Sequence, residues 1–475
     1  MIDFNNPDNV FWSIGQDGKV HLNNFRFKRF LEINNIFKNK PNDNSSFNLI
    51  KKNGIFLDIQ DETDIKDFVL PLVEHIENVY NLMSGNVKFF KRDFLSMIKS
   101  EKIEILKDTE KKAYLFYENG IVEVTKNKKE LKKYSDFNIS IWKDQVIKRD
   151  YIESDHHNSE FRTFIWKIAG ESVDRYNTFQ TVIGYLIHSY KTSGENKAII
   201  LNDEMISDEP NGRSGKGLFW NALKQMKKVQ SLDGKKFSFH GDFPYQSVKT
   251  DCQVLVFDDV KPNFQFINLF SVITEGIEIT YKGKDTIKLP VEESPKILIT
   301  TNYVIKGTGG SHDARKFEVE LSSFFNSKYS PVQFFGHYLF KDWNKEEWAR
   351  FDCYMIECLK KYLTHGLMNY ESISLPYKKL EVEIGTDLMD CIKTLKHNEW
   401  TNSDEFYNFY LSNVSKKWDA KKKNSVTSAI KKYCTFFKFE YDSVSPGGLM
   451  KFKINMTKPS PDDLNMFSQE EQMPF

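Results

Sequence analysis

Continuous apolar runs alternate with amphipathic segments in the middle of the chain. The runs at 197–203 (KAIILND), 252–260 (CQVLVFDDV) and 294–303 (SPKILITTNY) are short, rich in β-branched residues and bounded by polar residues. This pattern predicts strands buried on both faces, as in a mostly parallel sheet. Residues 218–228 (LFWNALKQMKK) have apolar residues at helical spacing. The alternation of such strands and helices predicts an α/β layer.

The first half of the chain shows a different pattern, with hairpins and amphipathic helices. Alternating apolar and polar residues predict two hairpins. One is at 11–23, with its turn at Asp17-Gly18, and the other is at 111–126, with its turn at Asn119-Gly120. We expect a strand at 54–59 and helices at 23–37, 61–83, 161–170 and 173–190, from apolar residues spaced three and four apart.

The last part of the chain reads as a small separate module. Residues 372–379 (SISLPYKK) look like a linker, and 380–455 carry three helical patterns followed by two strands that meet at Pro446-Gly447-Gly448. Three helices and a hairpin are the order of a winged helix. We therefore predict these parts: an N-terminal α+β region (1–150), a helical collar-like segment (151–195), an ATPase domain (196–371), a winged helix (372–459) and an acidic disordered tail (460–475).

Composition sets limits on the kind of protein. The 475 residues are too many for one core, and 40% hydrophobic with 28% charged residues are values of a folded globular chain. The net charge of +1 means that any nucleic-acid surface must be a local patch. The five cysteines form no CxxC pair, and no apolar run reaches about 18 residues. We expect buried, reduced thiols, no membrane contact and a cytoplasmic location.

The stretch 207–226 (SDEPNGRSGKGLFWNALKQM) follows the first strand and resembles a phosphate-binding loop that opens a helix. Such a loop directs free backbone N–H groups and the positive end of the helix dipole toward a phosphate. Pro210 and Gly217 stand where the usual G-x-x-x-x-G-K-[ST] pattern has glycine and a hydroxyl. The alternative is a glycine loop without function. The predicted ATP-binding residues are Gly212, Arg213, Ser214, Gly215, Lys216, Gly217 and Leu218.

Polar residues end the next two strands. Asp258 and Asp259 follow the run at 252–257, and ligands of parallel sheets bind at this end of the strands. Neighbouring residues at a strand end point in different directions, so one carboxylate can hold Mg²⁺ while the other orients water. Asn302 ends the third strand as a neutral amide suited to a γ-phosphate, and Arg315 is suited to transition-state charge. The alternatives are a helix cap for the aspartates and a surface arginine.

Between these motifs, three lysines gather around one predicted hairpin tip. Tyr281, Lys282, Lys284 and Lys288 fit a finger that follows a sugar-phosphate backbone without selecting bases. The alternative is a solvated β-turn, because lysine and glycine are common in turns.

Together the four elements in chain order, "NGRSGKG", "VLVFDDV", "ITEGIEITYKGK" and "ILITTN" with Arg315, resemble superfamily 3 helicases, AAA+ type ATPases of the primase-helicase group of phages, plasmids and large DNA viruses. The resemblance implies a hexameric ring that uses ATP and Mg²⁺ to translocate on single-stranded DNA in a bacterial host cell. It also implies that Arg315 acts on the neighbouring subunit's nucleotide. Gly217 departs from the pattern, so Asp258, Asp259 and water would have to hold Mg²⁺. The primase half of such proteins is not evident.

Two features at the end of the chain point to partners. Residues 376–459 hold 15 Lys against 10 Asp and Glu, and a winged helix would bring Lys423, Ser425, Lys431 and Lys432 near DNA; the alternative is a packing role. The final Met473, Pro474 and Phe475 follow acidic residues and resemble the tip of bacterial single-stranded-DNA-binding proteins. Such a tip would recruit a primase, a polymerase or a host replication protein; the alternative is a frayed tail.

Two other functions remain open at this point. The chain could be an ATP-binding replication initiator or loader that does not unwind DNA processively. It could also be a scaffold whose altered loop no longer hydrolyses ATP.

Overall fold

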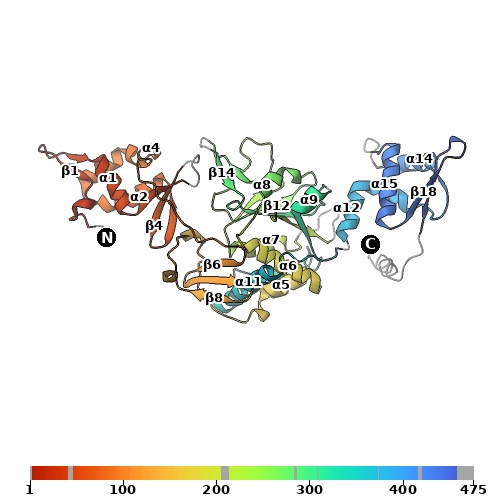
Figure 1. Ribbon diagram of the computed structural model, residues 1–475, viewed down its shortest axis with the longest axis horizontal. Helices are drawn as coiled ribbons and strands as arrows, with labels where there is room; N and C mark the ends of the chain where they lie inside the picture. Colours follow the sequence, from red (N-terminus) through yellow and green to blue (C-terminus); the bar gives the residue numbers. More distant parts are fainter. Residues whose placement is uncertain are drawn as a thin grey trace. The chain divides into compact units, whose positions relative to one another are not determined.

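The computed structural model describes residues 3–40, 47–204, 213–282, 286–307, 309–372, 374–415 and 420–456. It divides into two compact units, one formed by Met1–Asp203 with Ser207–Tyr370 and the other by Glu204–Ile206 with Glu371–Phe475. Figure 1 shows the elements of both. Within the described residues, no helix is both long and apolar enough to cross a membrane.

The first unit begins with a small α+β region. The hairpin of β1 (Trp12–Ile14) and β2 (Val20–Leu22) forms as predicted. The helix predicted at 23–37 is shorter, as α1 (Asn24–Ile33), because Ile36 and Phe37 belong to a strand. A second sheet has the order β3-β4-β5-β9 (Ile36–Asn39, Asn48–Asn53, Phe56–Gln60, Ile141–Trp142). The single helix predicted at 61–83 is wrong, because α2 (Glu62–Val73) and α3 (Glu77–Gly85) are separate. Pro71 near the end of α2 removes a helix hydrogen bond, which favours the break.

A three-stranded sheet and three helices follow. The hairpin of β6 (Lys112–Tyr117) and β7 (Gly120–Thr125) is continued by β8 (Lys129–Lys132). Its turn lies one residue earlier than predicted, at Glu118-Asn119, because the Asn119 side chain is fixed by hydrogen bonds of 2.9 Å with the backbone N–H and C=O of Tyr151. The predicted helices are α5 (Glu160–Ile168) and α6 (Val173–Ile187), and α6 packs along α11 (Lys345–His365).

The central element of this unit is a five-stranded parallel sheet, which confirms the predicted α/β layer. Its order is β11-β12-β15-β10-β16 (Val229–Asp233, Val254–Val260, Lys296–Thr301, Ala198–Asp203, Lys316–Leu321). Alternate residues face different cores: Ile199 and Leu201 belong to the cluster with α5, α6, α7 (Lys216–Lys224) and α11, whereas Ala198 and Ile200 face α8 (Phe270–Thr274) and its surroundings. Figure 1 shows these helices on opposite sides of the sheet.

Beside α8, a short hairpin pairs β13 (Gly276–Ile279) with β14 (Ile287–Pro290) in antiparallel register. A 3₁₀ turn, η6 (Phe266–Leu269), leads into α8. A short helix, α9 (Gly310–Arg315), precedes β16.

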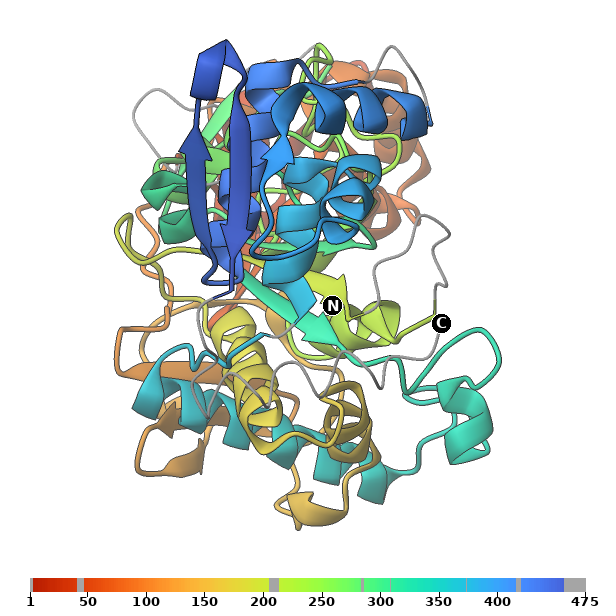
Figure 2. The ribbon, with the colours of Figure 1, turned by 90° about the vertical axis from the view of Figure 1, so that its right-hand side faces the viewer.

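The second unit has helices packed beside a small sheet. Its elements are α12 (Ser374–Ile384), α13 (Thr386–Lys393), β17 (Thr401–Asn402), α14 (Ser403–Asn413), α15 (Lys423–Phe436), β18 (Glu440–Val444) and β19 (Lys451–Asn455). β18 and β19 form the predicted hairpin, which Figure 2 shows beside the helices, and β17 adds to β19. The linker predicted at 372–379 is wrong, because Pro376 lies in the first turn of α12, where its missing N–H costs no helix bond.

All five cysteines are buried and free, as expected. The assignment of the segments to an ATPase domain, a collar and a winged helix remains a prediction.

Candidate functional site

Polar residues at the ends of three neighbouring strands meet at one edge of the parallel sheet. β12, β15 and β10 lie side by side, and they end at or near Asp258, Thr301 and Asp203. The strands are parallel, so their carboxyl ends lie at the same edge. The helix α7, which follows β10, begins there at Lys216.

The ammonium group of Lys216 connects two of these strand ends. Its Nζ donates to Asp203 Oδ2 at 2.6 Å, to the carbonyl oxygen of Thr301 at 3.0 Å and to Asn302 Oδ1. The Lys216 side chain is 12% exposed. Burial lowers the pKa of Lys216, while the carboxylates of Asp203, Asp259 and Asp258 oppose that shift. A buried cation held by oxygen atoms is therefore the centre of the site.

A β-bulge positions the two adjacent carboxylates. Phe257 pairs with Ile299 and Val260 with Thr301, so Asp258 and Asp259 together face the single residue Thr300. The Thr300 hydroxyl donates to Asp258 Oδ1 at 2.6 Å and accepts the backbone N–H of Asp259 at 2.8 Å. Asp259 has a φ of 56°, in the left-handed region that costs free energy for residues other than glycine.

The bulge gives the two carboxylates different partners. Asp259 accepts a hydrogen bond from the Asn302 amide at 3.3 Å and forms an ion pair with Lys235. Asp258 keeps the Thr300 hydroxyl as its hydrogen-bond partner. The structure therefore brings together Lys216, Asp258, Asp259 and Asn302, four residues that the sequence predicted for one site.

The loop that enters α7 has a backbone conformation that favours glycine at its last position. Gly215 caps the helix with a φ of 105°, and a Cβ atom there would lie 2.8 Å from the Phe164 ring. Gly217 is exposed, and a Cβ atom there would meet no atom within 4 Å. Arg213 is exposed with a φ of 85°. Leu218 is half-buried against the first core. Gly212 lies outside the described residues.

Buried polar atoms without partners lie at the same loop and strand end. The Ser214 hydroxyl, Asp203 Oδ1 and both side-chain polar atoms of Asn202 are buried without a hydrogen-bond partner in the described part of the chain. Buried polar groups in proteins nearly always find partners, and those that do not need an explanation. A ligand with oxygen acceptors and a bound cation would satisfy a hydroxyl and a carboxylate in this position, so the residues present fit a nucleotide with Mg²⁺.

The arrangement of the acids bears on how Mg²⁺ could be held. In the described ranges, a group of three potential metal ligands within 4.8 Å of one another is found at Asp155, His156 and His157, on the turn before α5. Asp258 and Asp259 do not belong to a group of this kind among the described residues. Mg²⁺ commonly keeps several waters and uses one or two carboxylates, so Asp258 and Asp259 suffice as a partial ligand set.

Asp203 is a partner of Lys216 that the sequence analysis missed. It ends β10, the strand before the loop, and its carboxylate is the charged partner of Lys216. The signal was present in the sequence, because Asp203 follows an apolar run in the same way as Asp258 does.

Arg315 lies apart from the Lys216 cluster. It is the last residue of α9, donates to the Ser311 carbonyl oxygen at 3.0 Å and stacks over the Phe270 ring at 4.7 Å. Its Nε is buried without a hydrogen-bond partner in the described ranges. No described contact joins Arg315 to Lys216 or to the two aspartates. Its role in catalysis therefore stays a prediction.

The predicted DNA-binding finger is a hairpin whose residues differ in exposure. Lys282 is exposed, and Lys288 is exposed with an ion pair to Glu278 across the hairpin at 3.0 Å. Tyr281 is half-buried, and its hydroxyl donates to the Val248 carbonyl oxygen at 2.8 Å, so it anchors the hairpin base. Lys284 lies outside the described residues.

In the second unit, two of the predicted DNA-facing lysines have acidic partners. Lys423 pairs with Asp404 and Lys432 with Glu383, whereas Lys431 lies over the Tyr441 ring at 5.2 Å. DNA contact by this face, including Ser425, stays a prediction. The tail residues Met473, Pro474 and Phe475 lie outside the described residues.

No family model and no curated protein matches the chain. Solved structures with a related arrangement include the A form apo structure of the NrS-1 C terminal region, at 10% identity and a TM-score of 0.44 over 90% of this chain and 99% of that chain. A second apo structure of the same region has 11% identity and a TM-score of 0.43 over 90% of this chain and 98% of that chain.

Proposed function

We propose that the chain is an ATPase, and that it binds the triphosphate at the edge of the parallel sheet where Lys216, Asp258, Asp259 and Asn302 meet. The observation that carries the proposal is this meeting of a helix-opening lysine with polar residues from three adjacent strand ends. A helix N-terminus and a lysine favour phosphate, and carboxyl ends of parallel strands are where such sheets bind ligands.

Each residue has a role that follows from its position. Lys216 would hold the β- and γ-phosphates of ATP in place of its present oxygen partners. Asp258 would hold Mg²⁺, and Asp259, in a separate direction, would orient the attacking water. Asn302, which contacts both Lys216 and Asp259, would connect the phosphate to that water. Mg²⁺, when bound, neutralises phosphate charge as the γ-phosphate is transferred. Ser214 and the loop N–H groups would bind further phosphate oxygens.

We further propose that hydrolysis drives a DNA helicase of the superfamily 3, AAA+ type, with a winged helix in the second unit. Support comes from the order of the motifs along the chain, from the side-by-side strands that carry them and from the exposed Lys282 on the hairpin. In a hexameric ring on single-stranded DNA, Arg315 would complete the neighbouring subunit's site. Its separation from the Lys216 cluster fits that role, because a residue acting in trans need not contact its own site.

Lys216→Ala tests the ATPase proposal directly. Loss of a preorganised cation at the reacting phosphate costs about 10²–10³ in rate, so phosphate release should fall at least that far. Lys236→Ala is the matched control, because Lys236 is an exposed lysine of the same unit with an 87% exposed side chain. Circular dichroism and thermal melting check that both variants fold. Phosphate release by Lys216→Ala equal to that of the control would end the ATPase proposal.

Strand displacement measured with the same proteins separates the helicase from an initiator or loader. A helicase unwinds a forked duplex, and Lys216→Ala abolishes this unwinding. ATP turnover and DNA binding without strand displacement would favour the initiator or loader instead.

A further inference from the structure

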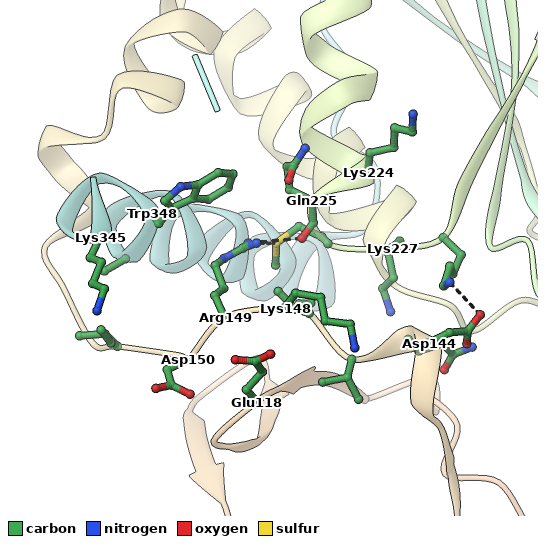
Figure 3. A pocket seen from close by; sticks show the side chains of 17 residues that line it. Glu118, Asp144, Lys148, Arg149, Asp150, Lys224, Gln225, Lys227, Lys345 and Trp348 are labelled. Atoms are coloured by element: carbon green, nitrogen blue, oxygen red, sulfur yellow. Dashed lines mark hydrogen bonds and ion pairs between the residues drawn. The ribbon is translucent and has the colours of Figure 1, made fainter. Parts of the chain in front are cut away.

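A cavity of about 830 Å³ lies in the first unit, and its lining contains none of the residues of the Lys216 site. Its walls come from the turn between β6 and β7, the segment 144–152, the end of α7 and the first turn of α11, as Figure 3 shows. Cavities of this volume are in the range that encloses small ligands. The charged residues lining it are Glu118, Asp144, Lys148, Arg149, Asp150, Lys224, Lys227, Lys228 and Lys345.

The cavity and the Lys216 site lie at opposite edges of the parallel sheet. Lys227 and Lys228 directly precede β11, at the amino ends of the strands, whereas Asp258 and Asn302 follow the carboxyl ends. The seven residues of β12 span about 20 Å at roughly 3.3 Å per residue. The helix α7 begins at one site with Lys216 and ends at the other with Lys224.

Cations outnumber carboxylates in the lining by six to three. Arg149 and Lys228 have acidic partners: Arg149 Nε donates to Asp352 Oδ2 at 2.8 Å, and Lys228 pairs with Asp144 at 2.7 Å. Lys148 and Lys345 are exposed and form no hydrogen bond or ion pair in the described ranges. Among the described residues, these two exposed ammonium groups of the lining therefore have no neutralising partner.

Two other cations of the lining, Arg149 and Lys227, are held by contacts with neighbouring segments. Arg149 lies over the Trp348 ring at 4.5 Å and donates to the Gln225 carbonyl oxygen at 3.3 Å, so it fastens the end of α7 to α11. Figure 3 shows Arg149 between these two helices. Lys227 is buried, donates to Ser189 Oγ at 3.0 Å and has Asp108 as its nearest carboxylate, at 3.9 Å. A fixed wall holds the cavity in shape for a ligand.

We propose that this cavity binds the phosphate groups of a single-stranded nucleic acid or a free nucleotide, and that Lys148 and Lys345 contact them. Lysine ammonium groups bind phosphate oxygens by charge and release counterions in doing so. The site is separate from the ATP site proposed above and does not depend on it. All three carboxylates of the cavity are exposed, but only Asp144 forms an ion pair among the described residues. Glu118 and Asp150 therefore oppose an anion, so removing the Glu118 charge should strengthen binding.

Equilibrium binding across a salt series tests the proposal, with the full chain and three probes: a labelled oligothymidylate, its duplex and a fluorescent ATP analogue. Each phosphate contact to a single strand contributes about 0.7 to the slope of log K against log [salt]. Lys148→Gln combined with Lys345→Gln should therefore lower the oligothymidylate slope by about 1.4, and Glu118→Gln should tighten binding. Lys328→Gln is the matched control, because Lys328 is an exposed lysine outside the cavity lining.

The three probes distinguish a nucleic-acid strand from a free nucleotide as the source of the phosphate. A weaker oligothymidylate complex in the double variant shows that a nucleic-acid strand binds there. A change confined to the ATP analogue, in a protein that also carries Lys216→Ala, shows that a free nucleotide binds there. If the double variant and the Lys328 control bind all three probes alike, with both proteins folded by thermal melting, the proposal is overturned. Because ATP hydrolysis is measured separately, this failure would leave the ATPase proposal standing.

Discussion

Replacing Thr300 by valine should disable the two carboxylates of the proposed ATP site without touching them. Thr300 is 1% exposed, and its hydroxyl binds both halves of the bulge, donating to Asp258 Oδ1 and accepting the N–H of Asp259. Valine has nearly the same shape but no hydroxyl. The substitution therefore removes two hydrogen bonds and leaves the packing of β15 intact.

The expected loss of stability follows from these two bonds. A hydrogen bond to a charged group contributes about 1.5–3 kcal/mol, and a buried N–H left without a partner costs about 1–3 kcal/mol. The free energy of unfolding should fall by about 3 kcal/mol in Thr300→Val. Asp259, held at a φ of 56°, would be free to leave that strained conformation.

The expected effect on catalysis is larger than the effect on nucleotide binding. Residues that orient the ligands of a metal typically matter by about 10–100-fold, so kcat for ATP should fall in that range. KM should change little, because Lys216, which would hold the phosphates, makes no hydrogen bond to the Thr300 side chain. Steady-state phosphate release and urea unfolding measure the two effects.

Thr301→Val is a control of matched chemistry. The Thr301 hydroxyl also makes two hydrogen bonds, donating to the Val260 carbonyl oxygen at 3.2 Å and accepting the Tyr303 N–H at 3.0 Å, but it contacts neither carboxylate. Thr301→Val should lower the free energy of unfolding by a similar amount, but its kcat should be higher than that of Thr300→Val. Thr300→Ser restores the hydroxyl and should restore kcat. Equal kcat values for the two valine variants would refute the role given to the bulge.

Three further substitutions test single features. In Gly217→Thr the new side chain meets open space and supplies a hydroxyl where phosphate-binding loops usually bind Mg²⁺. ATP turnover should therefore reach its half-maximal rate at a lower Mg²⁺ concentration. An unchanged Mg²⁺ dependence would count against the proposal that this loop binds the nucleotide. Gly215→Ala should lower the melting temperature, since a left-handed residue other than glycine costs about 1–2 kcal/mol and its Cβ would meet Phe164 at 2.8 Å, whereas Gly217→Ala should not. Burial lowers the pKa of Lys191 to about 7. The unfolded chain therefore binds more protons between pH 7 and the usual pKa near 10.5, and stability rises with pH there. Replacing Lys191 by methionine (Lys191→Met) should raise the free energy of unfolding by at most about 4 kcal/mol at pH 7. The variant should also lack the increase of stability with pH, which denaturant unfolding at several pH values measures.

Much of the central sheet could be predicted because its strands are buried on both faces. Short apolar runs such as 198–201 and 254–257, with a helical pattern between them, are typical of buried parallel strands, and both are strands in the structure. The short strands β3 and β4 were not predicted, because each has exposed or half-buried positions and depends on its neighbours for pairing. The helix α12 was missed because Pro376 and the serines before it are also typical of a linker.

The proximity of Lys216, Asp258, Asp259 and Asn302 could be predicted from the sequence, but Asp203 was missed and the geometry of the site could not be predicted. Strand ends and parallel pairing are enough to bring Asp258 and Asn302 together. The bulge is not encoded in any local pattern, because it depends on the register of β12 against β15 and on the Thr300 hydroxyl. Asp259 in a left-handed conformation is likewise a consequence of tertiary contacts that offset its strain.

Asp203 changes what nucleotide binding must accomplish at the proposed site. Lys216 is already fixed by a carboxylate, an amide oxygen and a backbone carbonyl oxygen. A triphosphate would therefore exchange partners of a buried cation instead of providing its first ones, and only the difference in interaction free energy would appear as affinity. The Asp203 charge would also repel the phosphates unless Mg²⁺ lay between them. It follows that Asp203→Asn should tighten binding of ATP without Mg²⁺, measured by equilibrium titration in EDTA, and weaker binding there would contradict this exchange.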